Sequence, residues 1–265
     1  MKRAIYTCLP EGRHKVLTMS FDDGQYFDKQ LVEIFNRYGI KGTFHLNSGL
    51  MNERKVQLSE IKEVYNGHEV SCHTKYHPTI ERCPLPQVVQ QIIEDRKLLE
   101  KEVGYPVRGM SYPNGSYSKD IISLLPACGI EYSRVIGNTD DFAFPDDFLE
   151  WKSTCHYRHN LMENGKRFAE LHKTQYLYMM YVWGHSYEFD TFNDWHLMEE
   201  FCEYIGGRDD IWYATNIEIV DYMNAAKNLK FTAEGDLVYN PNAISVWISV
   251  DGVMHKIEPG TTVTL

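Results

Sequence analysis

The chain has 265 residues, of which 43% are hydrophobic and 24% are charged, and its formal net charge is −10 at pH 7. This length and composition suit one α/β domain, alone or with a small appendage. The negative charge, without any basic stripe, argues against binding to the phosphate backbone of nucleic acids. No stretch approaches the roughly 20 apolar residues of a membrane span, and residues 1–15 lack the apolar segment of a secretory signal. We therefore expect a cytoplasmic protein with neither a nucleic-acid nor a membrane partner.

Short apolar runs alternate with stretches of helical periodicity as far as residue 229. Strands are predicted at 16–21, 43–47, 69–73, 109–112, 132–136, 176–183 and 212–214. Helices are predicted at 28–38, 58–65, 87–103 and 217–229, and two more begin at Ser118 and at Asn193 or Asp194. Such alternation indicates a parallel sheet with helices outside, either open or closed into a barrel. In both cases the chemistry is expected at the carboxyl ends of the strands.

The pattern changes after residue 229. The last stretch alternates apolar and polar residues with a period of two, and turn signals occur at 240–241, 251–252 and 259–260. We therefore divide the chain into a barrel or sheet domain over 1–229 and a small antiparallel β appendage over 230–265.

Carboxylates and imidazoles follow three of the predicted strands. Asp22 and Asp23 follow the first strand, His73 and His77 lie at the end of the third, and His185 follows the sixth. Two imidazoles and one carboxylate, with open positions left for water, suit a catalytic Zn²⁺, Co²⁺, Ni²⁺ or Fe²⁺ ion. One of the two aspartates could bind such an ion and the other could act as a base. A dication would also offset the repulsion between these neighbouring carboxylates.

Each of these features alone has a simpler explanation. Most pairs of histidines four residues apart bind nothing, and an Asp–Asp–Gly sequence is usually a turn or the start of a helix. A single histidine such as His185 is more often a hydrogen-bonded structural residue. The prediction of a site rests on their joint placement at strand ends.

Two of these segments resemble motifs of a known family. "SFDDG", residues 20–24, is similar to the first motif of the polysaccharide deacetylases, carbohydrate esterase family 4, and "HTKYH", residues 73–77, is similar to the second. The resemblance covers roughly residues 14–225. It implies a distorted (β/α) TIM-like barrel of seven or eight parallel strands, one divalent metal ion, and removal of acyl groups, usually acetyl, from acylated sugars.

The resemblance also implies roles for single residues. Asp23, His73 and His77 would bind the metal, with zinc as the first expectation and cobalt, nickel or iron as alternatives. Asp22 would be the general base that activates the metal-bound water, and His185 the general acid that protonates the leaving group.

The third motif of the family departs from its pattern here. The family arginine that orients the catalytic aspartate is replaced by Ser111, and Arg108 either reaches the same carboxylate or is a structural arginine. We expect Tyr112, Pro113 and Asn114 to line the substrate site, with a backbone N–H of this loop stabilising the oxyanion.

Three further residues are weaker candidates. Trp151 lies in a loose counterpart of the fourth family motif and is expected either to bind substrate or to pack in the core. His156 is expected to line the substrate groove, with a surface histidine as the alternative. Glu188 is expected to orient the His185 imidazole.

Together these features predict a metal-dependent hydrolase that acts on an acylated sugar or a similar small amide or ester. Two alternatives remain at this point. The substitution at Ser111 leaves open a barrel that keeps the metal and binds a glycan without turnover. Since related barrels share the same ligand set, hydrolysis of a non-sugar amide is also open.

Overall fold

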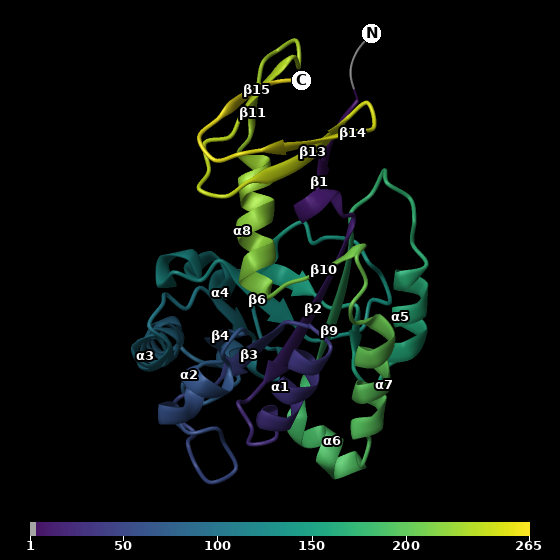
Figure 1. Cartoon of the computed structure of the whole chain (residues 1–265). Helices are drawn as coiled ribbons and strands as arrows, with labels where there is room; N and C mark the ends of the chain where they lie inside the picture. Colours follow the sequence, from purple (N-terminus) through teal and green to yellow (C-terminus); the bar gives the residue numbers. More distant parts are fainter. Residues whose placement is uncertain (1–3) are drawn as a thin grey trace.

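The strand that carries the two aspartates lies in the middle of the sheet. In the computed structural model, which describes residues 4–265, β2 (Lys15–Asp22) pairs along its whole length with β9 (Tyr178–His185). On its other side β2 pairs first with β10 (Ile211–Tyr213) and then with β3 (Gly42–Leu46). All three pairings are parallel, so β2, β3 and β9 end at the same edge (Figure 1).

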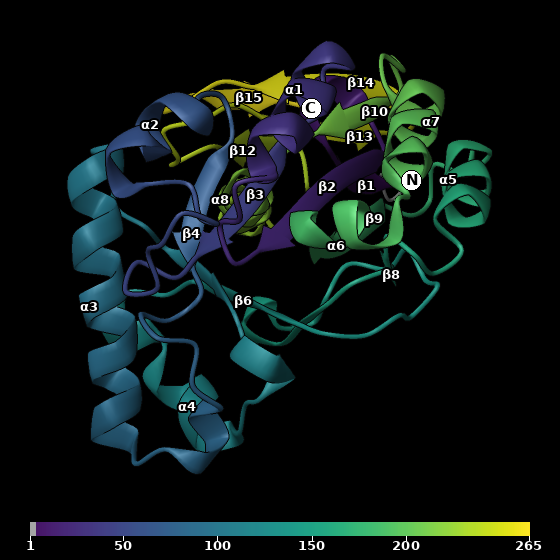
Figure 2. The same cartoon turned by 90° about the horizontal axis from the view of Figure 1, so that it is seen from below.

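The remaining strands extend this sheet on both sides until it curls into a barrel. Within residues 4–265 the sheet has nine strands, all paired in parallel, in the order β7-β6-β5-β4-β3-β2-β9-β8, with β10 beside β2. The added strands are β4 (Glu69–Cys72), β5 (Gly109–Ser111), β6 (Tyr132–Val135), β7 (Trp151–Lys152) and β8 (Cys155–His156). The two end strands, β7 and β8, are joined by only two residues, so the chain itself bridges the gap (Figure 2). The predicted distorted (β/α) barrel is confirmed.

Helices surround the sheet. They are α1 (Asp28–Arg37), α2 (Ile61–Val64), α3 (Leu85–Val103), α4 (Lys119–Leu124), α5 (Leu161–Ala169), α6 (Ser186–Phe192), α7 (Trp195–Ile205) and α8 (Asn216–Lys227). The Thr215 hydroxyl accepts a hydrogen bond from the backbone N–H of Glu218 and so caps α8. Of the helices described, none is both long and apolar enough to cross a bilayer.

The two faces of β2 show how the barrel separates its core from its site. Every residue of β2 is buried. Leu17, Met19 and Phe21 belong to the hydrophobic core between the sheet and the helices. The alternate residues Ser20 and Asp22 face the barrel interior, because successive side chains of a strand point to opposite faces. The barrel therefore has an apolar outer layer and a polar interior near the carboxyl ends of its strands.

The C-terminal appendage consists of two antiparallel sheets, one of which includes the N-terminal strand. One sheet consists of β11 (Lys230–Phe231), β12 (Leu237–Tyr239) and β15 (Thr262–Thr264). The second consists of β13 (Val246–Val250), β14 (Val253–Ile257) and the N-terminal strand β1 (Ile5–Cys8). The sequence analysis placed β1 in the barrel domain. Its pairing with β13 could not be seen locally, because the partner lies more than two hundred residues away in the chain.

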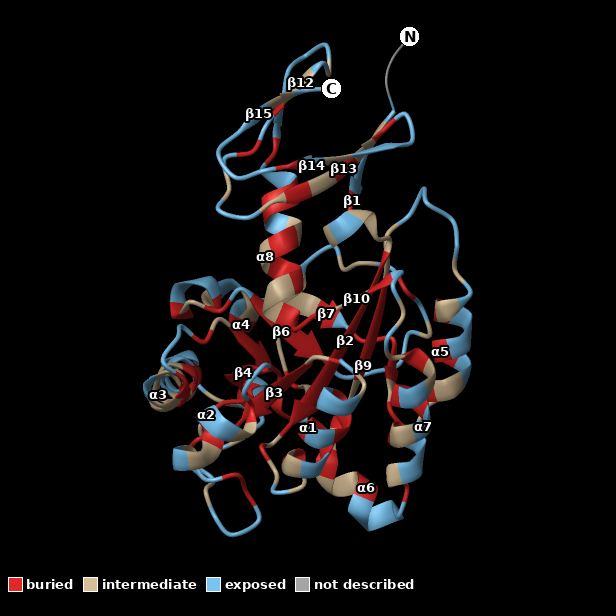
Figure 3. Cartoon of the chain, viewed as in Figure 1, coloured by how far each residue is buried: buried red, intermediate tan, exposed pale blue. Residues whose placement is uncertain are grey.

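The appendage lies at the end of the barrel away from the carboxyl ends of the strands. In Figure 1 it stands above α8, whereas β2 points downward to the opposite end, and Figure 3 shows the buried strands below it. A second hydrophobic core, which includes Val16, Ile219 and Ile248, joins the appendage to α8 and the barrel floor. The appendage therefore does not contribute to the predicted site.

Candidate active site

Asp22 is a buried carboxylate held by two neighbouring strands. The Ser111 hydroxyl donates to its Oδ1 at 2.9 Å, and an Nη2–H of Arg134 donates to its Oδ2. Ser111 and Arg134 are paired positions on β5 and β6, so both side chains reach the barrel interior at the same level. Burial alone would raise the pKa of Asp22, but Arg134 and then His73 outweigh it and hold that pKa well below its usual range. Asp22 is therefore ionised at neutral pH.

Asp23 points toward two imidazoles instead. Its backbone N–H donates to the carbonyl of His45 at 2.8 Å, and its φ of 80° turns the chain out of the strand. Its Oδ1 lies 4.0 Å from Nε2 of His73 and 3.9 Å from Nε2 of His77. His77 also has a positive φ, 52°. Left-handed backbone at two non-glycine residues is uncommon and concentrates at functional sites.

His73 has the orientation and protonation state of a metal ligand. Its Nδ1–H donates to the Ser111 carbonyl at 2.9 Å, which leaves the lone pair of Nε2 directed at Asp23 and His77. Burial lowers the pKa of His73 to about 4, although Asp22 and Asp23 oppose that shift. The imidazole is thus neutral at physiological pH. A hydrogen bond from the far ring nitrogen to a carbonyl is the usual way in which a ligating histidine is oriented.

The donor set fits one divalent ion. One ligand atom each of Asp23, His73 and His77 lies within 4.8 Å of the other two. Their separations of 3.9–4.0 Å are too long for hydrogen bonds but leave room for an ion bound to all three. Two imidazoles and one carboxylate suit zinc and also cobalt, nickel or iron.

His185 lies beside Asp22 at the end of the adjacent strand. The two residues are paired positions on β9 and β2. His185 Nδ1 is 3.4 Å from Oε1 of Glu188, whose Oε2 is 2.9 Å from Nε2 of His156. Burial alone would lower the pKa of His185, but Glu188 and then Asp22 outweigh it and raise that pKa above its usual value. The acid predicted from the sequence therefore contacts the carboxylate predicted to orient it. His156 contacts the same carboxylate.

The first residues of the loop after β5 differ in whether their backbone N–H is free. The N–H of Tyr112 donates to the Arg134 carbonyl, and the Tyr112 side chain is buried with its hydroxyl donating to the carbonyl of Leu149. Pro113 is also buried and has no N–H. Asn114 is exposed, and its N–H has no acceptor among the described residues. Its side chain donates to Thr79, two residues after His77, which places this loop next to the candidate metal ligands.

Two predicted site residues lie elsewhere. Arg108 forms ion pairs with Asp221 and Glu131, so the prediction that it reaches Asp22 is wrong. It precedes β5, whereas the aspartate is held at the opposite end of that strand. The Trp151 side chain is fully buried among aromatic rings that include Tyr132, so its prediction as a substrate contact is also wrong, and its alternative as a packing residue holds.

Two residues of the site escaped the sequence analysis. Arg134 could have been found, because an arginine inside an apolar strand that is buried on both faces needs an anionic partner. Asp95 lies on α3, where it accepts hydrogen bonds from the backbone N–H of Ser48 at 2.8 Å and of His73 at 3.1 Å. Helical periodicity could have revealed Asp95, because it lies three residues after Ile92 and four before Leu99 and so falls on the apolar face of that helix.

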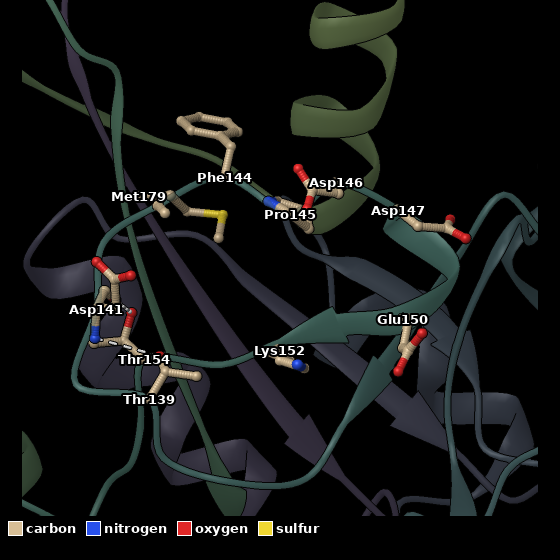
Figure 4. A pocket seen from close by; sticks show the side chains of 11 residues that line it. Thr139, Asp141, Phe144, Pro145, Asp146, Asp147, Glu150, Lys152, Thr154 and Met179 are labelled. Atoms are coloured by element: carbon tan, nitrogen blue, oxygen red, sulfur yellow. Dashed lines mark hydrogen bonds between the residues drawn. The ribbon is translucent and has the colours of Figure 1, made fainter.

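A separate cavity of about 280 Å³ lies beside β7 (Figure 4). Figure 4 shows Asp146, Asp147 and Glu150 around it, with Lys152 between the carboxylates and Asp141. It contains no histidine and none of the residues predicted for catalysis. We assign it no part in the site.

Fold and site together define a (β/α) barrel with a candidate metal centre at the carboxyl ends of its strands. A family model described as polysaccharide deacetylase matches residues 10–133, which include β2 to β5 and the three candidate ligands. The resemblance seen in the sequence is thereby confirmed over residues 10–133, slightly less than half of the chain.

Curated relatives match part of the chain. A peptidoglycan-N-acetylglucosamine deacetylase of Listeria monocytogenes is 26% identical over 134 residues, which are 49% of this chain and 28% of that protein. A chitooligosaccharide deacetylase of Sinorhizobium fredii is 24% identical over 115 residues, 42% of this chain and 53% of that protein. The matches thus span about half or less of the length of these relatives.

A solved structure shares most of the fold. The crystal structure of a putative polysaccharide deacetylase from Mycobacterium smegmatis aligns with a TM-score of 0.58 at 15% identity, covering 83% of this chain and 93% of the other. At this identity the likeness supports the barrel fold alone.

Proposed function

We propose that the chain is a metal-dependent hydrolase that removes an acetyl group from an N- or O-acetylated sugar. The observation that carries this proposal is the convergence of Asp22, Asp23, His73, His77 and His185 at one end of the barrel. The names of the two relatives support the choice of an acetylated sugar as substrate.

In this proposal Asp23, His73 and His77 hold one divalent ion, zinc being the first choice. When bound, the ion supplies Lewis-acid chemistry, because it polarises the acyl carbonyl and makes a nearby water more acidic. Asp22 accepts a proton from the water whose oxygen attacks the acyl carbon. Ser111 and Arg134 hold that carboxylate in place.

Two groups of the chain act on the other atoms of the substrate. The free N–H of Asn114 donates to the oxygen that becomes negative when water adds to the carbonyl. His185 then donates a proton to the amine or alcohol as the bond from the acyl carbon breaks. Glu188 and His156 orient His185, and acetate and the free amine or alcohol are the products.

The contact between Arg134 and Asp22 argues against the alternative of a barrel that binds a glycan without turnover. The reason for that alternative was the loss of the family arginine at Ser111. Because Arg134 contacts the same carboxylate from the adjacent strand, the aspartate still has a guanidinium partner. We therefore favour turnover over glycan binding alone.

Metal content and acetate release, measured on the same preparations, test the proposal. We expect the wild type to carry close to one equivalent of metal and to release acetate from acetylated sugars. Asp22→Asn should keep the metal and lose at least 100-fold in kcat. His77→Ala should lose the metal. A wild type that binds no metal after reconstitution, or an Asp22→Asn variant with full activity, would refute the assignment.

A further inference from the structure

A second group of side chains that can bind a metal ion lies near the first. One ligand atom each of His156, His185 and Glu188 lies within 4.8 Å of the other two. All three residues are partly exposed, so ions in solution reach them. Two imidazoles and one carboxylate form the same kind of donor set as the candidate ligands of the first site. The proposed function uses these residues as the acid and its orienting partners and assigns no ion to them.

The spacing of the three groups suits one tetrahedral ion. Nε2 of His156 is 2.9 Å from Oε2 of Glu188, and Nδ1 of His185 is 3.4 Å from Oε1 of the same carboxylate. Bonds of about 2.0–2.1 Å to a tetrahedral zinc ion place neighbouring ligand atoms about 3.3 Å apart. Nδ1 of His185 is also buried and has no hydrogen-bond partner among the described residues. An ion between the two rings and the carboxylate would give this nitrogen a partner.

Two paired strands and one helix hold the three side chains in place. His156 and Trp183 are paired positions on β8 and β9, and His185 follows Trp183 by two residues, so both imidazoles lie on the same face of the sheet. The Trp183 ring lies against both, with centroids 4.7 Å from that of His156 and 6.0 Å from that of His185. Glu188 lies in the first turn of α6, where its Oε2 accepts a hydrogen bond from the His185 backbone N–H at 3.4 Å. The donor set is therefore formed before any ion binds.

An ion in this position would disable the proposed acid. A protonated imidazole donates from both of its ring nitrogens. Zinc on Nδ1 of His185 takes the place of one proton, which is released to solvent, and the ring keeps a single N–H. This N–H is a much weaker acid than a protonated imidazole, so it does not protonate the leaving group.

The contacts of the two imidazoles make this site weaker than the first. The Arg158 backbone N–H donates to Nδ1 of His156 at 3.3 Å, so Nε2 carries the proton of the neutral ring. An ion that binds Nε2 moves this proton to Nδ1 and breaks that hydrogen bond. The ion must also displace the proton that His185 carries as the acid. We therefore expect the second site to fill only when zinc is in excess over the first.

We propose that His156, His185 and Glu188 form a second, weaker zinc site, and that zinc bound there inhibits the enzyme by blocking its acid. The inhibition rests on the proposed function, whereas the binding of zinc does not. The enzyme would thus need one zinc ion for activity and be inhibited by a second.

Calorimetric titration of Zn²⁺ into metal-free protein tests the second site without any measurement of activity. We expect two equivalents to bind to the wild type, one to His77→Ala and one to Glu188→Gln. The double variant should bind none. His159→Ala is the matched control, because His159 lies three residues after His156 and pairs with a different carboxylate, that of Asp140. It should still bind two equivalents. One equivalent in the wild type and none in His77→Ala would overturn the second site.

Acetate release at rising zinc concentration tests the inhibition and separates it from the proposed function. We expect kcat of the wild type to fall about tenfold as the second equivalent binds. Glu188→Gln, compared with its own activity at one equivalent, should need roughly tenfold more zinc for the same fall. Two bound equivalents with unchanged kcat would overturn the inhibition. A second equivalent that only Glu188→Gln loses supports the site even if the wild type releases no acetate. A wild type that binds one equivalent and releases acetate would refute the second site and keep the hydrolase.

Discussion

Replacing Arg134 by methionine tests the central electrostatic claim, that this guanidinium keeps Asp22 ionised. The Arg134 side chain is fully buried, and its partner carboxylate is 3% exposed. Removing one partner of a buried ion pair costs about 3–5 kcal/mol, because the other charge is left uncompensated. In a chain of this size that loss lowers Tm by roughly 10 °C. Asp22 can limit the loss by taking up a proton, since Arg134 is the strongest of the charges that lower its pKa.

Protonation of Asp22 would also remove the proposed base. We therefore expect Arg134→Met to lose at least about 100-fold in kcat at pH 7 and to recover part of it at higher pH. Arg134 contacts none of the proposed metal ligands directly, so the metal content should equal that of the wild type. Thermal unfolding, kcat between pH 6 and 9, and metal analysis together measure these effects. A variant with unchanged Tm and unchanged kcat would refute the reasoning.

An exchange of the two paired residues provides the positive control. Ser111 and Arg134 occupy paired positions on β5 and β6, and each contacts one oxygen of Asp22. The double variant Ser111→Arg/Arg134→Ser moves the guanidinium by one strand. It should be at least tenfold more active than Arg134→Ser alone. If the exchange restores nothing although the variant folds and binds metal, the strand from which the guanidinium comes matters as much as its charge.

Three further predictions concern the barrel itself. Burial raises the pKa of Glu69 from 4.5 to about 7. Its contribution to stability, about 3 kcal/mol, is therefore complete below pH 4.5 and is lost as the pH rises through 7. Urea denaturation between pH 5 and 8 should show a steeper fall in the free energy of unfolding for the wild type than for Glu69→Gln, in which Asp28 and Asp95, whose pKa values burial also raises, still titrate. A Cβ at Gly109 would lie 2.0 Å from Cζ of Tyr132, so Gly109→Ala should cost about 3 kcal/mol, and an unchanged Tm would contradict that clash. Asp95→Ala removes an acceptor from the His73 backbone and should weaken metal affinity about 10–100-fold, as measured by competition with a chelator.

Local patterns predicted the parallel sheet, whereas the family resemblance supplied its closure into a barrel and the choice of Asp23 as a candidate ligand. Alternating strands and helices fix a parallel sheet, and residues that follow parallel strands must meet at one edge. The two adjacent aspartates could therefore be grouped with His73 and His77 before any distance was known. Helix α5 (Leu161–Ala169) was missed, because no strand of clear apolar periodicity precedes it.

What the sequence did not predict depends on contacts between distant segments. Arg108 is close to Ser111 in sequence, but the strand separates it from Asp22, whereas Arg134 is 23 residues from Ser111 and pairs with it across the sheet. Trp151 matched a family motif in sequence, yet it points into the aromatic core. Strand register, which no local pattern determines, decides both cases.

The two adjacent aspartates show how register resolves an apparent electrostatic conflict. The sequence analysis assigned the relief of their repulsion to one dication. In the structure their environments separate at the end of β2. Asp22 completes the strand and points inward to Ser111 and Arg134, whereas Asp23 adopts a φ of 80° and points to the two imidazoles. Because Asp22 already has a guanidinium partner, the charge of a bound ion is offset chiefly by Asp23. In the proposed function the ion would therefore serve the chemistry and Asp23, while the ionised state of Asp22 depends first on Arg134.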